Sequence, residues 1–287
     1  MMKRLIHEKI NVAVLITCHN RVQKTQACLK SLFNQKKIEN VSLKVFLVDD
    51  GSTDGTKEYV KKYFPQVNLI VGNGKLYWGG GTYLAWETAI NSNDHFDFFL
   101  LLNDDVFLYD EAIYILLKTQ TEHSDIICGS ICDPITKKRT YGGAIFNRSF
   151  FRPLKYKVVD INGKPQEIDT INGNAVLIPL TAFKKIGKFD KELIHSGGDL
   201  DYSLRARNIN IKIFLTPSHI GTCERLLEVN HAVSLLDKIE NIFHIKTLPS
   251  KRFYKKHAGL LWFFHFFIAY IKAIISTLFK HKYFKNN

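Results

Sequence analysis

In the first half of the chain, short apolar runs rich in β-branched residues alternate with amphipathic stretches. The apolar runs predict strands at Ile10–Thr17, Leu43–Val48, Val67–Val71 and Phe96–Leu102. The stretches between them predict helices at Thr25–Phe33, Gly55–Phe64 and Thr82–Ile90. Buried strands that alternate with helices are typical of a parallel sheet covered by helices. We therefore expect an α/β fold with a mostly parallel central sheet flanked by helices.

The second half of the chain is less regular. Residues 141–170 mix Gly, Pro, Arg and Lys with short β-like pieces, which indicates an irregular excursion. Regular elements are then expected as a strand at Ala175–Ile178, a helix at Thr181–Ile186, a helix that begins near Asp199 and a strand at Ile211–Leu215. At 287 residues and 46% hydrophobic, the chain is long enough for one substantial core. We expect one domain over residues 1–245, with halves at about 1–106 and 107–245, and a tail over residues 246–287.

The charge of the chain indicates a partner that carries phosphates. Lys and Arg number 40 against 27 Asp and Glu, a formal net charge of +13. Such an excess suits a nucleotide, a nucleic acid or an anionic lipid, and charge alone does not choose among them. The five cysteines are irregularly spaced, and the start MMKRLIHEKI lacks the apolar core of a signal peptide. We therefore expect a reducing, cytoplasmic setting.

The tail has the pattern of a membrane-associating helix. Four basic residues, Lys251, Arg252, Lys255 and Lys256, precede the apolar run AGLLWFFHFFIAYIKAIISTLF, and Lys280 and Lys282 follow it. A span of the bilayer needs about 20 apolar residues, but His265 and Lys272 interrupt this run. We expect an interfacial helix whose lysines meet anionic headgroups, which attaches the protein peripherally to the inner face of the plasma membrane. The alternative is a hydrophobic helix packed back on the domain.

Polar residues follow two of the predicted strands in the first half. The segment LITCHNR presents Thr17, Asn20 and Arg21, and VDDGSTDGT presents Asp49 and Asp50 before a Gly turn. Ligands collect at the carboxyl ends of strands in open α/β sheets, so these residues are candidates for one shared crevice. Alternatively, the first segment only begins a helix and the second is an ordinary acidic turn.

The fourth predicted strand ends in FFLLLNDDV, where Asp104 and Asp105 follow Asn103. Two carboxylates at the mouth of a buried strand repel each other unless a cation lies between them. Oxygen ligands of this kind suit Mg²⁺ or Mn²⁺. We therefore expect a divalent metal on Asp104 and Asp105.

The segment HSGGDLDYSLRAR places two carboxylates at the start of a helix, behind a Gly pair that allows close approach of a substrate. Asp199 is the candidate general base, because a carboxylate within hydrogen-bond reach of a hydroxyl can accept its proton. Asp201 is either a further ligand contact or the partner of Arg205 one turn on. His195 is a candidate contact to the acceptor or a phosphate.

Taken in order, TCHNR, VDDGSTDGT, LNDDV and INGNAVLIPLTAFKKIGKFDKELIHSGGDLDYSLRAR resemble the family 2 glycosyltransferases of the GT-A fold, from about Val12 to Cys223. The resemblance implies nucleotide binding by the acidic turn and donor contacts from the first segment. The D-x-D motif for metal and diphosphate falls on the triplet at 103–105, with Asn in first place. The E-D-x-D acceptor motif falls on residues 198–201, with Gly198 in place of Glu, Asp199 as base and Asp201 on the acceptor side.

Two further assignments come from the same resemblance. LYWGGGTYLAWE resembles the Gly-rich loop and following helix that border the donor sugar, with Tyr77, Trp78 and Gly79 at the sugar, although the aromatics alternatively pack in a loop. His219 stands where some relatives place a His against metal or diphosphate. Residues 1–106 then form the donor half and 107–245 the acceptor half.

The implied activity is an inverting, Mn²⁺- or Mg²⁺-dependent hexosyl or deoxyhexosyl transfer from a nucleotide diphosphate to a glycan or lipid-linked saccharide, as in bacterial surface-polysaccharide biosynthesis. One alternative is a nucleotidyltransferase, but LITCHNR lacks the basic Gly-rich phosphate loop. A second is a non-catalytic sugar- or lipid-binding protein on the same fold. A nucleic-acid binder is not expected, because the positive charge concentrates in the tail and no nucleic-acid motif is present.

Overall fold

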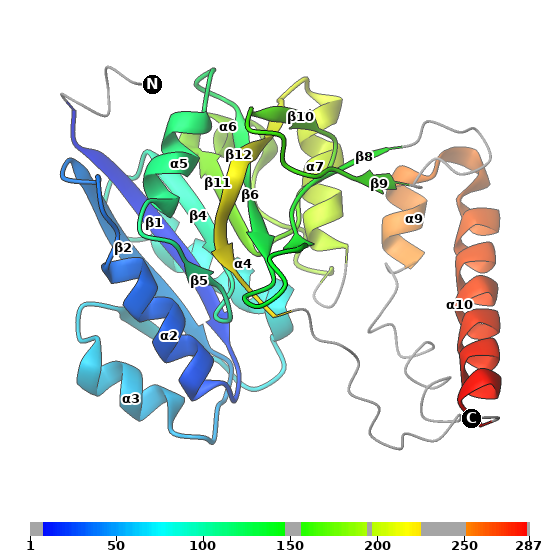
Figure 1. Cartoon of the computed structure of the whole chain (residues 1–287), viewed down its shortest axis with the longest axis horizontal. Helices are drawn as coiled ribbons and strands as arrows, with labels where there is room; N and C mark the ends of the chain where they lie inside the picture. Colours follow the sequence, from blue (N-terminus) through cyan, green and yellow to red (C-terminus); the bar gives the residue numbers. More distant parts are fainter. Residues whose placement is uncertain (1–7, 147–155, 194–196, 225–250, 286–287) are drawn as a thin grey trace.

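A computed structural model describes residues 8–146, 156–193, 197–224 and 251–285 of the chain. Its central feature is a ten-stranded sheet with helices on both faces (Figure 1). The strands of this sheet are β1 (Ile10–Cys18), β2 (Val41–Asp49), β3 (Asn68–Val71), β4 (Phe98–Leu102), β5 (Phe107–Leu108), β6 (Ile126–Cys132), β7 (Arg139–Tyr141), β10 (Gln166–Ile168), β11 (Ala175–Pro179) and β12 (Ile213–Thr222). A separate pair consists of β8 (Ala144–Phe146) and β9 (Tyr156–Val158).

Most of the helices belong to the sheet layer, and the last ones form the tail. They are α2 (Val22–Phe33), α3 (Thr56–Tyr63), α4 (Tyr77–Ile90), α5 (Ala112–Thr119), α6 (Leu180–Ile186), α7 (Gly198–Asn208), α9 (Lys251–His257), the short turn η1 (Gly259–Leu261) and α10 (Trp262–Lys285). The predicted α/β class is confirmed, and each of the four strands predicted in the first half is present within two residues of its expected bounds.

The order of strands is β10-β12-β6-β11-β4-β1-β2-β3, with β5 beside β12 and β7 beside β6. The four strands β3, β2, β1 and β4 are parallel to one another. By contrast, β11 lies between β4 and β6 and runs antiparallel to both. The sheet thus contains antiparallel strands, but β6 and β12 are parallel to each other and run in the same direction as β4, so the mostly parallel sheet that we predicted is confirmed. Strand direction depends on how the chain returns to the sheet, which an apolar run does not encode.

The core has two layers, one on each face of the sheet. Alternate residues of β1 point to opposite faces, as the pleat requires: Val12 and Val14 join one cluster, Ala13 and Leu15 the other. The first cluster takes in buried side chains of α2, α3 and α5, and the second those of α4, α6 and α7. Trp86 of α4 is fully buried in the second cluster.

Helix α4 begins at Tyr77 rather than at the predicted Thr82, so the glycines of LYWGGGTYLAWE lie inside the helix and not in a loop. One of them, Gly81, allows close packing of the helix on the sheet. A Cβ atom added to Gly81 would lie 2.3 Å from Cγ2 of Thr17 on β1. Glycine therefore lets α4 cross β1 at a distance that a larger residue would prevent.

The tail divides into a docked part and an exposed part. Phe253 and Tyr254 of α9 are buried with Leu193, and Leu200 and Leu204 of α7 pack against them. The long helix α10 extends beside the domain, away from the sheet (Figure 1). Within the residues that the structure describes, no helix meets the length and apolarity needed to cross a membrane.

Candidate active site

A pocket of about 260 Å³ opens beyond the carboxyl end of β4 and reaches the start of α7. It is lined by Trp78, Asn103, Asn172, Gly173, Asn174, Gly197 and Asp199. Asn103, which precedes the predicted metal-binding pair, and Asp199, the predicted base, therefore line the same pocket. This is the edge of an α/β sheet where ligands are expected.

The acidic pair after β4 faces a cation of the protein itself. The Nη1 atom of Arg21 lies 3.2 Å from Oδ1 of Asp104 and 3.1 Å from Oδ2 of Asp105. The Thr25 hydroxyl donates to Oδ2 of Asp104 at 3.3 Å. Burial, reinforced by the charge of Asp105 and opposed by Arg21, raises the pKa of Asp104 to about 6. The strand end therefore concentrates negative charge that a cation must neutralise.

The acidic pair fits a divalent metal in its chemistry. Oδ1 of Asp105 is buried and has no hydrogen-bond partner among the described residues, while Oδ2 contacts a guanidinium. Carboxylate oxygens are the ligands that Mg²⁺ and Mn²⁺ prefer. Within the described part of the chain, no cluster of three or more His, Cys, Asp or Glu residues forms a complete ligand set. Water and substrate phosphates usually supply the other ligands of such ions.

His219, the predicted third metal ligand, lies on β12 and contacts the neighbouring strand β6. Its Nδ1 lies 2.9 Å from Oγ of Ser130 on the neighbouring strand. Burial and the positive charge of Arg139 lower the pKa of His219. A residue just after β12 that lies close to the acidic pair is Cys223, whose pKa is raised to about 12 by burial and by the charge of Asp105. No pattern in the sequence singled out Cys223. The Ser130 bond engages one of the two ring nitrogens of His219, so metal binding by His219 stays a prediction.

The acidic turn after β2 divides into two roles. Oδ1 of Asp49 accepts the Ser52 amide at 2.9 Å. Asp49 is the last residue of β2, so it lies at the end of this strand, where ligands are expected. Both oxygens of Asp50 are occupied: Oδ1 accepts the Gly74 amide at 2.8 Å, and Oδ2 accepts the Leu76 and Tyr77 amides at 2.9 and 3.0 Å. Asp50 therefore holds the segment that leads into α4, and the expectation of donor binding by Asp50 is not supported.

The residues after β1 also differ in role. Asn20 has a left-handed backbone, with φ of 49°, and its Oδ1 accepts the Thr53 amide at 2.7 Å. It thus ties the ends of β1 and β2 together. The Oγ1 atom of Thr17 is buried without a hydrogen-bond partner among the described residues, in contact range of α4. Of the three predicted donor contacts in this segment, Arg21 is the one that reaches the acidic pair.

Trp78 forms one wall of the pocket, and Asn103 fixes it there. The indole Nε1 donates to Oδ1 of Asn103 at 2.7 Å, and its ring lies against Phe189. A Cβ atom on Gly173 would lie 2.3 Å from the indole, so glycine is needed behind the ring. The neighbouring Gly79 is buried inside α4. Asn103 therefore supports the wall of the pocket, which gives the Asn in the first position of the triplet a structural role.

Asp199 lies at the start of α7 and faces the pocket. The helix follows Gly197, whose φ of 84° is left-handed, so a glycine is required at this entry. Burial raises the pKa of Asp199 above its ordinary value, although hydrogen bonds from the Leu200 and Gly173 backbones oppose the rise. A carboxylate with a raised pKa beside a pocket has the properties of a general base.

Asp201 is fully buried on the other side of the same turn. Arg205 donates to its Oδ2 at 2.8 Å, and Lys256 and His257 of α9 contact its Oδ1 at 2.5 and 2.8 Å. Burial alone would raise its pKa, but these bonds and the charge of Arg205 hold the pKa of Asp201 well below its usual range. Because Asp201 is fully buried and both of its oxygens contact basic side chains, the structure favours the ion-pair alternative. Gly198 is buried beside it, and His195 lies outside the described residues.

The comparisons with known proteins give one family and several structures. The sequence model of glycosyl transferase family 2 matches residues 13–187. No curated protein sequence matches the chain.

Three solved structures illustrate the structural similarity. TarS 1-349 of S. aureus in complex with UDP-GlcNAc is 18% identical, with a TM-score of 0.54, over 81% of this chain and 64% of that one. The mannosyltransferase PcManGT of Pyrobaculum calidifontis with GDP-Man and Mn²⁺ is 14% identical, with a TM-score of 0.57, over 96% and 78% of the two chains. GalNAc-T7 with UDP, GalNAc and Mn²⁺ is 13% identical, with a TM-score of 0.57, over 76% and 44%. This chain thus spans less than two thirds of TarS 1-349, and the likeness shows a shared GT-A fold.

Proposed function

The chain belongs to glycosyl transferase family 2, and from this membership we propose that it moves a sugar from a nucleotide diphosphate to a hydroxyl of a glycan or lipid-linked acceptor, with inversion. The observation that carries the proposal is the pocket between Asn103 and Asp199. It has room for a sugar ring, with the acidic pair next to one wall and the half-buried carboxylate of Asp199 at the other.

In this reaction the acceptor oxygen forms a bond to the anomeric carbon while the bond from that carbon to the diphosphate oxygen breaks. Asp199 accepts the proton of the acceptor hydroxyl as the new bond forms. Asp104 and Asp105 would hold a Mn²⁺ or Mg²⁺ ion, which supplies positive charge for the leaving diphosphate. A single displacement from the face opposite the leaving group inverts the anomeric centre, and no covalent intermediate is needed.

The solved relatives support a nucleotide donor without naming it. One contains UDP-GlcNAc and another contains GDP-Man with Mn²⁺. At their low identity they leave the base and the sugar open for this chain. The competing functions are a nucleotidyltransferase and a non-catalytic sugar- or lipid-binding protein. A screen for binding of nucleoside diphosphates directly distinguishes the proposed transferase from the non-catalytic binding protein.

We expect one nucleoside diphosphate among UDP, GDP, dTDP and CDP to stabilise the protein in a thermal-shift screen, and only when Mn²⁺ is present. A ligand at a hundred times its dissociation constant adds about 2.7 kcal/mol of stability. Asp105→Asn should lose this response because it removes a carboxylate from the predicted metal site. Asp94→Asn, at an exposed ion pair with Lys44, should keep it. If no diphosphate stabilises the protein at millimolar concentration, the non-catalytic alternative becomes the better account.

We further place the enzyme at the inner face of the plasma membrane, in surface-polysaccharide biosynthesis. The support is an exposed apolar surface on η1 and α10, which we call the tail surface: Leu260, Leu261, Phe263, Phe264, Phe267, Ile268, Ile271 and Ile275. Lys251 and Lys255 nearby are exposed, whereas Arg252 and Lys256 are engaged by acidic residues of the domain. Part of the basic segment that we expected at the headgroups therefore docks α9 instead.

The tail surface should bind vesicles of phosphatidylcholine mixed with phosphatidylglycerol more tightly than vesicles of phosphatidylcholine alone. In the double variant with Phe263→Glu and Phe267→Glu, whose rings lie 4.4 Å apart, binding should weaken at least tenfold. Each buried aromatic ring contributes about 1.5–3 kcal/mol, and the added charges repel the anionic lipid. Ile135→Glu, at an 87% exposed residue of the domain, is the matched control. Equal sedimentation of all three proteins would remove the support for membrane attachment.

A further inference from the structure

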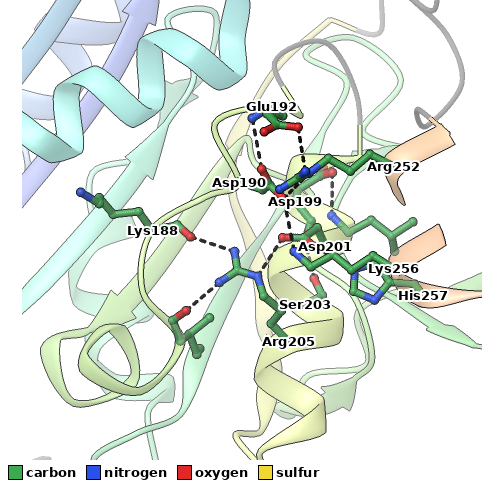
Figure 2. Close-up of polar contacts among 12 residues, drawn as sticks. Lys188, Asp190, Glu192, Asp199, Asp201, Ser203, Arg205, Arg252, Lys256 and His257 are labelled. Carbon is green, nitrogen blue, oxygen red and sulfur yellow. Dashed lines mark hydrogen bonds and ion pairs between the residues drawn. The ribbon is translucent and has the colours of Figure 1, made fainter. Parts of the chain in front are cut away.

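A cluster of charged residues joins α9 to the segments around Asp199. We call it the α7–α9 cluster: Asp190, Asp201, Arg252, Lys256 and His257. Figure 2 shows the three basic side chains of α9 directed toward the two carboxylates. Arg252 lies 3.0 Å and Lys256 3.4 Å from Oδ2 of Asp190, and Lys256 and His257 also contact Oδ1 of Asp201. The cluster therefore ties one short helix to two places in the domain.

The two carboxylates flank the candidate base in the sequence. Asp190 precedes α7, and Asp201 lies in its first turn. Arg252 and Lys256 are one turn apart on α9, so they share a face of that helix. Beneath the charges, Phe253 is fully buried against Leu193, and its ring lies 5.0 Å from that of His257. The docking of α9 thus combines an apolar contact with charge pairing.

Asp199 and Asp201 point in opposite directions from the same turn. Two residues along an α-helix correspond to a rotation of about 200°. Asp199 accordingly lines the pocket while Asp201 meets α9. The first turn of α7 therefore lies between the pocket and α9, and any rotation of that turn would move the carboxylates of both Asp199 and Asp201.

The start of α7 has little local support of its own. Gly197 is the N-cap and provides no side-chain hydrogen bond, and Gly198 follows it. On the pocket side, the Ser203 hydroxyl donates to the Asp199 carbonyl at 2.7 Å and accepts the Ile171 amide at 2.9 Å. On the other side, Asp201 is held by Arg205 and α9. Two glycines at the start of a helix do not fix its direction, so the contacts of Ser203 and Asp201 must do so.

We infer that α9 is a positioning element of the reaction, in which Lys256 and His257 hold Asp201 and thereby keep Asp199 directed into the pocket. The inference rests on the proposed function, since it assigns a purpose to the geometry of the base. Burying a carboxylate such as Asp201 with basic partners is an inefficient way to stabilise a fold, because apolar residues of similar size do as well. It does define one orientation of the turn, which a base requires.

The test uses the full chain and the release of nucleoside diphosphate from a sugar nucleotide, with water as the sugar acceptor. The donor carries the nucleoside diphosphate that stabilises the protein in the thermal-shift screen. We expect His257→Ala to lower kcat by about 100-fold, as for a misplacement of about 1 Å, with KM for that donor unchanged. His257→Gln, which can still donate to Asp201, should recover most of kcat. Arg207→Ala is the matched control, because it removes an ion pair with Asp169 from the last turn of the same helix. It should leave kcat unchanged.

Amide hydrogen exchange on the same proteins shows whether the turn has moved. In His257→Ala, exchange should rise in the first turn of α7 and not in its last turn. Unchanged kcat in His257→Ala, or a fall in kcat without faster exchange in the first turn, would overturn the inference. An equal loss of kcat in Arg207→Ala would also overturn it, since general destabilisation of α7 would then suffice. A wild-type protein that releases no diphosphate from sugar nucleotides of UDP, GDP, dTDP or CDP contradicts the proposed function instead, and the two failures are thus distinct.

Discussion

Asp199→Asn is expected to lower kcat by about a thousandfold, because a positioned general base contributes about 10²- to 10⁴-fold to a proton transfer. The amide has nearly the same shape as the carboxylate but accepts no proton. Binding of nucleoside diphosphate and Mn²⁺ should be unchanged, since Asp199 lies on α7 whereas the acidic pair follows β4. The loss should therefore appear in kcat and not in the thermal shift with nucleotide.

The pH dependence gives a second measurement of the same residue. Burial raises the pKa of Asp199, and a base works only when it is deprotonated. The activity of the wild-type protein should thus fall as the pH drops through this raised pKa, at a higher pH than an exposed carboxyl would give. Asp160→Asn, at a 79% exposed side chain, should keep both the rate and the profile. A rate within tenfold of wild type in Asp199→Asn would assign the base elsewhere.

The sequence was sufficient for the local elements but not for the direction of every strand. The apolar runs of β1 and β4 predicted these strands well, because a strand buried on both faces is apolar along most of its length. The same rule applied to β11, which is equally apolar and yet antiparallel to β4. The start of α4 was missed because three consecutive glycines normally disfavour a helix. Close packing on Thr17 outweighs that preference here.

The candidate site shows a related limit. Acidic motifs located the strand end at Asp104 and the helix start at Asp199, and the structure brings both to one pocket region. The motifs did not separate carboxylates that face the pocket from those used inside the protein. Asp201 meets its partner His257 56 residues further along the chain, so no local pattern reveals the pairing. Burial, which the motif does not encode, decides between the two roles.

Asp50 offers the sharpest test of this distinction. Asp50→Ala is expected to lower the free energy of unfolding by at least about 4 kcal/mol, since hydrogen bonds to a charged group contribute about 1.5–3 kcal/mol each and three amides lose their acceptor. Asp50 is 3% exposed, so water does not readily replace the carboxylate. Urea denaturation followed by tryptophan fluorescence measures the change. The Gly74 to Tyr77 segment leads directly into Trp78, so the variant should also weaken nucleotide binding indirectly.

Asp54→Ala is the matched control, because this neighbouring carboxylate also accepts backbone amides, from Val22 and Thr56, but lies near the surface. Its loss should cost about 1 kcal/mol, as for other helix-start contacts. Asp50→Asn should fall between the two, since its one oxygen can still accept from Leu76 and Tyr77 while its amide group meets the Gly74 N–H. If Asp50→Ala unfolds no more easily than Asp54→Ala but loses nucleotide binding, Asp50 contacts the donor after all. A large loss of stability instead assigns the carboxylate to the scaffold that carries Trp78 to the pocket.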